Sequence, residues 1–101
     1  MRGGGADAAR RPFTIDRMGD AIQVTVRLFG PLREAAGTGR IPLSLRPATP
    51  AGAVWGFLPD AVRRAGLPEG TRYAINHEWT LPGAPLRDGD EVALVVPGSG
   101  G

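Results

Sequence analysis

The sequence predicts an α+β domain in which a mixed β-sheet is packed against one main helix. Apolar and polar residues alternate in two segments, 22–28 and 91–96, which is the period of a half-buried strand. Between them, apolar residues recur at helical spacing over residues 54–58. A chain of 101 residues is the length of one domain.

Glycine marks the two ends of the chain. It clusters at residues 3–5 and again at residues 98–101, and the first 20 residues show no apolar periodicity. We therefore expect a disordered N-terminal tail over 1–20, a folded domain over 21–96 and a flexible Gly-Gly tail over 97–101. Met18 stands just before the patterned sequence and is a candidate for the natural start.

The first strand is predicted at residues 22–28, where every second residue is apolar. Phe29 then falls on the outer face. Pro31 suits the first turn of a short helix over residues 32–36, and Gly37 suits its C-terminal cap. A second strand over residues 41–45 follows so closely that we expect it to lie antiparallel beside the first.

The main helix is predicted to begin at Thr49-Pro50, a capping hydroxyl followed by proline at the first helical position. Pro59-Asp60 interrupts the helical spacing, so the second half is predicted as a kinked or restarted turn that ends at Gly66. The buried face is expected to carry Val54, Phe57 and Leu58.

Short strands complete the sheet. Residues 73–75 and 79–81 are predicted as two strands joined by a turn, and Gly89 is free to take a positive φ in the tight turn over 86–90. The last strand, 91–96, and the first are the most apolar, so we expect them side by side in the centre. This order of elements is a β-grasp arrangement.

The composition excludes several classes of function. The 12 basic residues are all arginine, 10 acidic residues are interspersed with them, and the net charge is only +2. A nucleic-acid-binding face needs clustered cations. Cysteine is absent, which excludes disulfides and thiolate chemistry. No segment has the pattern of a membrane span or a signal peptide, so we expect a cytoplasmic protein that binds neither membrane nor nucleic acid.

Few side chains suggest a metal or catalytic centre, and we expect no metal site. His77 is the only histidine and is interpreted as a turn residue. Asp88, Asp90 and Glu91 lack the spacing of a Ca²⁺ loop and are interpreted as turn formers. Trp55 and Trp79 are expected to be packing residues.

Three segments resemble one known family. Residues 26–37 (VRLFGPLREAAG) resemble its opening strand and first helical turn, and residues 86–92 (LRDGDEV) resemble its acidic turn before the last strand. The sequence ends, as the family does, at Gly100-Gly101. This family is the small subunit of molybdopterin synthase, within the ubiquitin-like sulfur carriers that also include the thiamine-pathway carrier. The sequence departs from the family pattern at His77, where glycine is common, and in the tail, where the family usually has two prolines.

The resemblance implies a specific chemistry at the tail. The carboxylate of Gly101, preceded by Gly100, would be adenylated by ATP, converted to a thiocarboxylate and used to give sulfur to a pyranopterin. The chain would not be an enzyme on its own and would hold no permanent cofactor, only the transient acyl-adenylate at Gly101. The implied partners are the large catalytic subunit of molybdopterin synthase in a heterotetramer, a ubiquitin-activating-like adenylyltransferase and a sulfur donor protein.

An exposed apolar patch near the tail is a candidate docking surface. Phe29, Val95 and Pro97 are predicted on or near the outer face of the central strands, and Gly98 and Ser99 follow in the tail. The alternative is that a loop or the N-terminal tail covers them. Other functions also stay open: a sulfur carrier for thiamine, cysteine or another thio-metabolite, a ubiquitin-like protein modifier, or a plain interaction domain.

Overall fold

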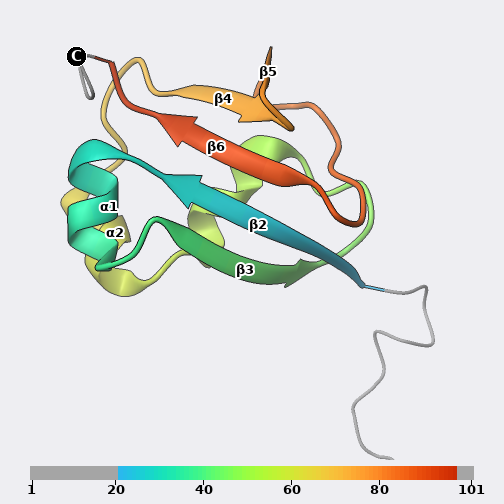
Figure 1. Cartoon of the computed structure of the whole chain (residues 1–101), viewed down its shortest axis with the longest axis horizontal. Coiled ribbons are helices and arrows are strands. Elements are labelled where there is room, and N and C mark those ends of the chain that lie inside the picture. Colours follow the sequence, from blue (N-terminus) through green and yellow to red (C-terminus); the bar gives the residue numbers. More distant parts are fainter. Residues whose placement is uncertain (1–20, 98–101) are drawn as a thin grey trace, which may run out of the picture.

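The computed structural model describes residues 21–97, and within them the chain forms five strands and three helices. The elements, in chain order, are β2 (Ile22–Leu28), α1 (Gly30–Ala36), β3 (Arg40–Leu45), the 3-10 helix η2 (Ala51–Phe57), α2 (Asp60–Ala65), β4 (Arg72–Ile75), β5 (Glu78–Thr80) and β6 (Glu91–Val95). The strands form one sheet in the order β3-β2-β6-β4-β5 (Figure 1). The central pair, β2 and β6, is parallel, and the other pairs are antiparallel. The predicted β-grasp arrangement is confirmed.

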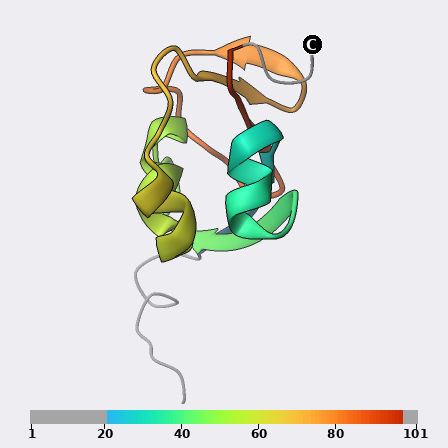
Figure 2. The same cartoon turned by 90° about the vertical axis from the view of Figure 1, so that its left-hand side faces the viewer.

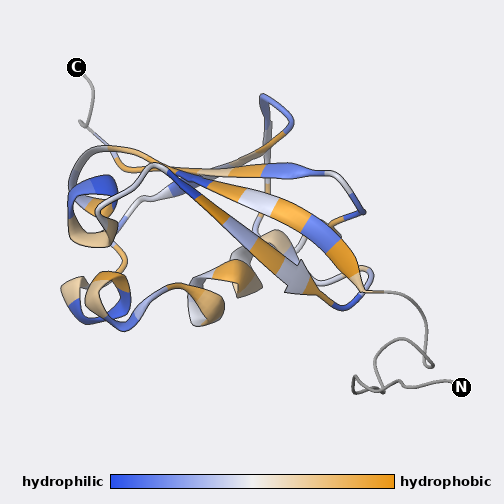
Figure 3. Ribbon diagram, turned by 60° about the horizontal axis from the view of Figure 1, so that its bottom comes forward, coloured by the Kyte–Doolittle hydropathy of each residue, from blue (hydrophilic) through white to orange (hydrophobic). Residues whose placement is uncertain are grey.

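The three helices within residues 21–97 lie on one face of the sheet, and the core fills the space between the two layers (Figures 2 and 3). The alternation in β2 and β6 sends one apolar set into this core, with Val26 and Val92 paired in register and completely buried. The predicted inward set of the last strand is also confirmed, since Leu94 and Val96 are buried. The opposite face of the sheet is left uncovered by any helix within residues 21–97.

The first helix follows its predicted signals closely. α1 begins at Gly30, with Pro31 in its first turn, and therefore starts two residues earlier than predicted. Gly37 closes it in the left-handed conformation, with φ of 76°, and donates its N–H to the carbonyl of Arg33 at 2.9 Å. Glycine suits this position because a Cβ disfavours positive φ.

The prediction of one main helix is wrong, because two separate short helices occupy this segment. The segment divides into η2 and α2 because Leu58 and Pro59 are extended, with ψ of 161° and 151°. A residue before proline is kept out of the helical region by the proline ring, which explains the break at Leu58. Leu58 enters the core, whereas Phe57 is 56% exposed and does not belong to the buried face as predicted.

The predicted Thr49 cap is also wrong. The Thr49 hydroxyl donates to the carbonyl of Arg46 at 2.7 Å, and η2 begins without a side-chain cap. Its first N–H groups are satisfied instead by a distant loop, where Ala51 donates to Ala84 O and Gly52 to Pro82 O, both at 2.8 Å. A helix end needs partners for these groups but not a particular kind of partner.

The β4–β5 hairpin turns at Asn76 and His77, which have φ of 52° and 73°. His77 is therefore a turn residue, as predicted, and β5 begins at Glu78, one residue before its predicted start. The Asn76 side chain ties the turn to β6: its Oδ1 accepts the Glu91 N–H at 2.9 Å, and its Nδ2 donates to Asp90 Oδ1 at 2.9 Å. This side chain thus joins the hairpin to the central sheet.

Replacing Asn76 by alanine should lower the free energy of unfolding by about 2 kcal/mol, because two hydrogen bonds are lost and the left-handed backbone is less tolerated. Urea denaturation measures this value. The matched control is His77→Ala, since His77 also has positive φ but is mostly exposed and should change stability by less than about 0.5 kcal/mol. Equal losses in the two variants would contradict the role given to the Asn76 side chain.

Candidate functional site

The two central strands finish at the same end of the sheet, where their C-terminal residues lie side by side. Because β2 and β6 are parallel and Leu28 pairs with Leu94, the next residues, Phe29 and Val95, occupy neighbouring positions. Phe29 is 36% exposed, Val95 is half-buried, and Pro97 is exposed just beyond them. In Figure 1 this end of the sheet lies beside α1, where the chain continues beyond β6.

These three residues are brought to one end of the sheet, and no loop within residues 21–97 buries Phe29 or Pro97. Their role in partner binding stays a prediction. The other predicted site residues, Gly98, Ser99, Gly100 and Gly101, lie outside the described residues, as does the N-terminal tail over 1–20.

Gly70 supports the base of the tail. It has φ of +83°, and a Cβ placed on it would lie 3.0 Å from Cγ of Pro97. The turn that holds it is tight, since the backbone N–H and the hydroxyl of Thr71 both donate to the carbonyl of Pro68, at 3.2 and 2.6 Å. The Pro-Glu-Gly-Thr sequence is typical of a turn, but sequence reasoning missed its contact with Pro97.

Gly70→Ala should move the tail base as well as strain the backbone. Gly89→Ala is the matched control, because Gly89 has φ of +87° and nothing lies within 4 Å of its would-be Cβ. Both variants should lose about 1–2 kcal/mol of unfolding free energy. Only Gly70→Ala should shift the NMR signals of the Val95 and Val96 amides. Similar shifts in the control would refute a specific contact at Pro97.

A cluster of charged side chains lies on the face of β2, β3 and β6 that no helix within residues 21–97 covers. Oε2 of Glu91 lies 3.3 Å from Nη1 of Arg27 and 3.3 Å from Nη2 of Arg40, and its Oε1 lies 3.4 Å from Nε2 of His77. The Arg27 guanidinium also lies over the Phe29 ring, 5.3 Å from its centroid. The sequence pattern indicates only a turn at Glu91 and does not predict this cluster.

A second cation–aromatic pair lies at the far edge of the sheet. The Arg72 guanidinium stacks 4.1 Å from the Trp79 ring centroid. Trp79 is 56% exposed, so the prediction that it is a packing residue is wrong, whereas Trp55 does pack against the core. A tryptophan on a three-residue edge strand cannot reach the core from the outer face of the sheet.

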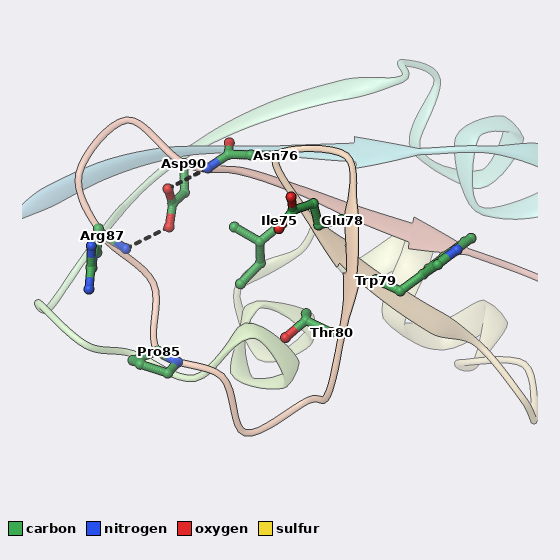
Figure 4. A pocket seen from close by; sticks show the side chains of 8 residues that line it. All are labelled: Ile75, Asn76, Glu78, Trp79, Thr80, Pro85, Arg87 and Asp90. Carbon is green, nitrogen blue, oxygen red and sulfur yellow. Dashed lines mark hydrogen bonds between the residues drawn. The ribbon is translucent and has the colours of Figure 1, made fainter.

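The acidic turn before β6 lines a recess of about 510 Å³ together with the β4–β5 hairpin (Figure 4). Both carboxylate oxygens of Asp90 are engaged, one by the Asn76 amide and the other by the Arg87 backbone N–H at 2.8 Å. The Trp79 ring points away from the other lining side chains. The bond from Arg87 closes the turn, so Asp90 is a turn former as predicted, whereas Asp88 accepts the Gln23 N–H at 2.7 Å and ties the turn to β2.

Within residues 21–97, no three His, Asp or Glu side chains gather as a metal site would require. Burial raises the pKa of Tyr73 above its ordinary value, which keeps the phenol neutral. No helix in this part of the chain has the length and apolarity to cross a membrane.

Comparison with known proteins identifies the family. The model of the ThiS family matches residues 26–101, which include the end of β2, all of β6 and the Gly100-Gly101 end. The chain belongs to the ThiS family. ThiS-family proteins are small ubiquitin-like sulfur carriers that are not catalytic alone. The predicted carrier class is thereby confirmed, although the match does not distinguish among the thio-metabolite pathways. No curated protein matches the sequence significantly.

Solved structures agree with the ThiS-family fold. The small archaeal modifier protein 1 of Haloferax volcanii aligns with a TM-score of 0.67 and 21% identity, over 75% of this chain and 98% of that one. The corresponding modifier of Methanosarcina acetivorans gives 0.58 and 29%, over 82% and 100%. A chain from the complex of subunits 1 and 2 of the molybdopterin-converting factor from Helicobacter pylori 26695 gives 0.55 and 22%, over 79% and 100%.

Proposed function

We propose that this protein carries sulfur as a thiocarboxylate on Gly101 for the synthesis of molybdopterin. The observation that carries the proposal is the ThiS-family match up to Gly101, combined with a tail that leaves the sheet from its central strand at Pro97. A central strand is paired on both sides and therefore forms a firm base for the tail. The domain would thus hold one reactive group out toward its partners.

The proposed chemistry has two activation steps. A carboxylate is a poor electrophile, so a Gly101 oxygen first attacks the α-phosphate of ATP and releases pyrophosphate. Hydrosulfide supplied by the sulfur donor then attacks the acyl carbon, displaces AMP and loses its proton, which leaves the thiocarboxylate. In the last step the thiocarboxylate sulfur attacks a substrate carbon and displaces an oxygen leaving group, and water then cleaves the acyl–sulfur bond, which leaves the sulfur on the substrate and regenerates the Gly101 carboxylate.

Both activation and delivery require a thin tail. Gly100 and Gly101 have no side chains that would obstruct a narrow channel, and they accept backbone angles closed to other residues. Fully extended, the segment from Pro97 to Gly101 would reach about 15 Å at about 3.3 Å per residue. Gly98 and Ser99 would lie inside the same channel of the partner, and Phe29 and Val95 would contact the partner surface around its entrance.

The molybdopterin assignment has its own support. The segments at 26–37 and 86–92 resemble the small subunit of molybdopterin synthase. The Helicobacter pylori chain of this fold comes from a complex of subunits 1 and 2 of the molybdopterin-converting factor. By analogy, we propose a large catalytic subunit as the acceptor partner and an ATP-dependent adenylyltransferase as the activating partner. The acyl-adenylate is transient, and no resident cofactor is proposed.

Protein modification is the second candidate function, favoured by the fold shared with small archaeal modifier proteins. In that case, the activated Gly101 would form an amide with lysines of other proteins. The chain contains no lysine, so it could not extend itself into a chain through side-chain amide bonds.

Intact-protein mass spectrometry tests the proposal. After incubation with an activating enzyme, ATP and a sulfur donor, the mass should rise by the exchange of one oxygen for sulfur at Gly101. The loaded protein, mixed with the large subunit and a pyranopterin precursor, should return to its original mass as a dithiolene forms. Loading without transfer to the pterin would favour another thio-metabolite pathway, higher-mass conjugates would favour protein modification, and the absence of loading would refute a carrier role.

A further inference from the structure

Three arginines surround one recess beside the base of the tail. The recess has a volume of about 330 Å³, and its lining includes Arg27, Phe29, Arg33, Thr38, Gly39 and Arg40. It lies where β2 ends and α1 begins, at the same end of the sheet from which β6 leaves (Figure 1). A partner that receives the tail would therefore face this recess.

The recess has an excess of positive charge. Arg27 and Arg40 occupy directly opposite positions of β2 and β3, where like charges repel each other. Both contact the same oxygen of Glu91, at 3.3 Å each. Arg33 forms no salt bridge within residues 21–97, so Glu91 pairs with two of the three guanidinium groups and the third has no carboxylate among the described residues. A second anion would offset the remaining repulsion.

The Arg33 side chain is positioned by the backbone beneath it. A Cβ placed on Gly39 would lie 3.4 Å from Nε and 3.5 Å from Cδ of Arg33, so the arginine stem packs over this glycine. Gly39 is itself fixed, since its carbonyl accepts the Leu28 N–H at 2.9 Å. The Thr38 hydroxyl accepts the Arg40 N–H at 3.3 Å and stabilises the same loop. The contact of its stem keeps the exposed Arg33 guanidinium beside the recess, where its N–H donors are available to an anion.

We propose that this recess binds an acidic segment of the partner protein that takes up the tail. The segment would place one carboxylate on Arg33 and a second between Arg33 and Arg40, with an apolar side chain against the exposed ring of Phe29. Guanidinium and carboxylate match as paired, charge-assisted hydrogen bonds. The existence of a tail-accepting partner rests on the proposed function, whereas the ability of the recess to bind carboxylates does not.

NMR titration of the full chain tests the carboxylate site directly. A blocked peptide, Ac-Glu-Glu-Phe-NH2, should shift the backbone amides of Arg33, Thr38 and Gly39, and the effect should weaken with added salt. Arg33→Gln should weaken the peptide affinity about tenfold, which corresponds to about 1.4 kcal/mol. Arg64→Gln is the matched control, because Arg64 is an exposed arginine on α2 and should leave the affinity unchanged.

Three results would overturn the proposal. Equal weakening by the two substitutions would show a diffuse charge effect, and the absence of shifts around Gly39 would show that the recess does not bind the peptide. Tighter binding of inorganic phosphate than of the peptide would identify a phosphate site instead of a docking site. Deletion of Gly101 separates the two proposals, because the truncated chain should still bind the peptide even if the sulfur chemistry proposed for the tail is wrong.

A second experiment measures the steady-state kinetics of sulfur loading by the activating enzyme. Arg33→Gln should raise the KM for the carrier about tenfold in the loading reaction and leave kcat unchanged, because docking precedes chemistry and Arg33 does not touch the reacting atoms. Arg64→Gln should leave both values unchanged. A fall in kcat without a rise in KM would contradict a docking role for Arg33.

Discussion

Deletion of Gly101 should reduce sulfur loading at least about 100-fold. The deletion moves the terminal carboxylate back by one residue, about 3.3 Å, and reacting groups misplaced by even about 1 Å lose roughly 100-fold in rate. The fold should not change, because β6 ends at Val95 and none of its pairs with β2 or β4 is removed. Intact-mass measurement of the loaded fraction over time gives the rate.

Ser99→Ala is the control for the deletion. It alters the same tail without shortening it, so loading should stay within about threefold of the starting protein, since the reach of the chain is preserved. Circular dichroism and thermal melting of both variants should match the unmodified chain. Normal loading of the truncated protein would show that Gly101 is not the activated residue and would refute the proposed tail chemistry.

Leu94→Ala should destabilise the domain more than any other substitution proposed above. Leu94 of β6 is completely buried, in register with Leu28 on one side and Tyr73 on the other. Truncation of such a side chain costs about 3 kcal/mol, from lost burial and from the cavity left behind. For a domain of this size, that loss should lower the Tm by roughly 15 °C.

Val95→Ala is the matched control for Leu94→Ala. Val95 is the next residue of the same strand, but it points to the uncovered face and is only half-buried. Its truncation should cost about 1 kcal/mol or less. Thermal melting and urea denaturation measure both values. Equal losses at the two positions would contradict a core confined to the helix-covered face.

The local pattern was sufficient to predict most strands and turns. Alternation over 22–28 and 91–96 predicted the correct buried faces, because a side chain's face in a strand depends only on its position along that strand. Pro31, Gly37 and Gly89 were interpreted correctly since their backbone preferences are intrinsic. The identities of Gly100 and Gly101, with the matching segments upstream, were enough to suggest a sulfur carrier, which the ThiS-family match confirms as a class.

Predictions from the local pattern were wrong where the conformational preference of a residue competes with contacts to distant parts of the chain. Thr49 had the residue type of a helix cap, but the N–H groups of η2 found the carbonyls of Pro82 and Ala84 instead. Phe57 had the spacing of a buried residue, but η2 ends at Phe57 and Leu58 is extended, so Leu58 is buried as predicted while Phe57 stays exposed. Propensity is a weak bias that tertiary contacts of this kind override.

The sequence by itself determined the fold class, the central pair of strands and the carrier class, because periodicity, turn chemistry and family motifs are all encoded in neighbouring residues. Only the tertiary structure decided that Gly70 meets Pro97 and that Arg33 packs over Gly39 beside Arg27 and Arg40. These contacts join residues from separate elements, and they depend on how the sheet register and loop geometry bring those elements together. The base of the tail and the arginine recess therefore became visible only once the chain was folded.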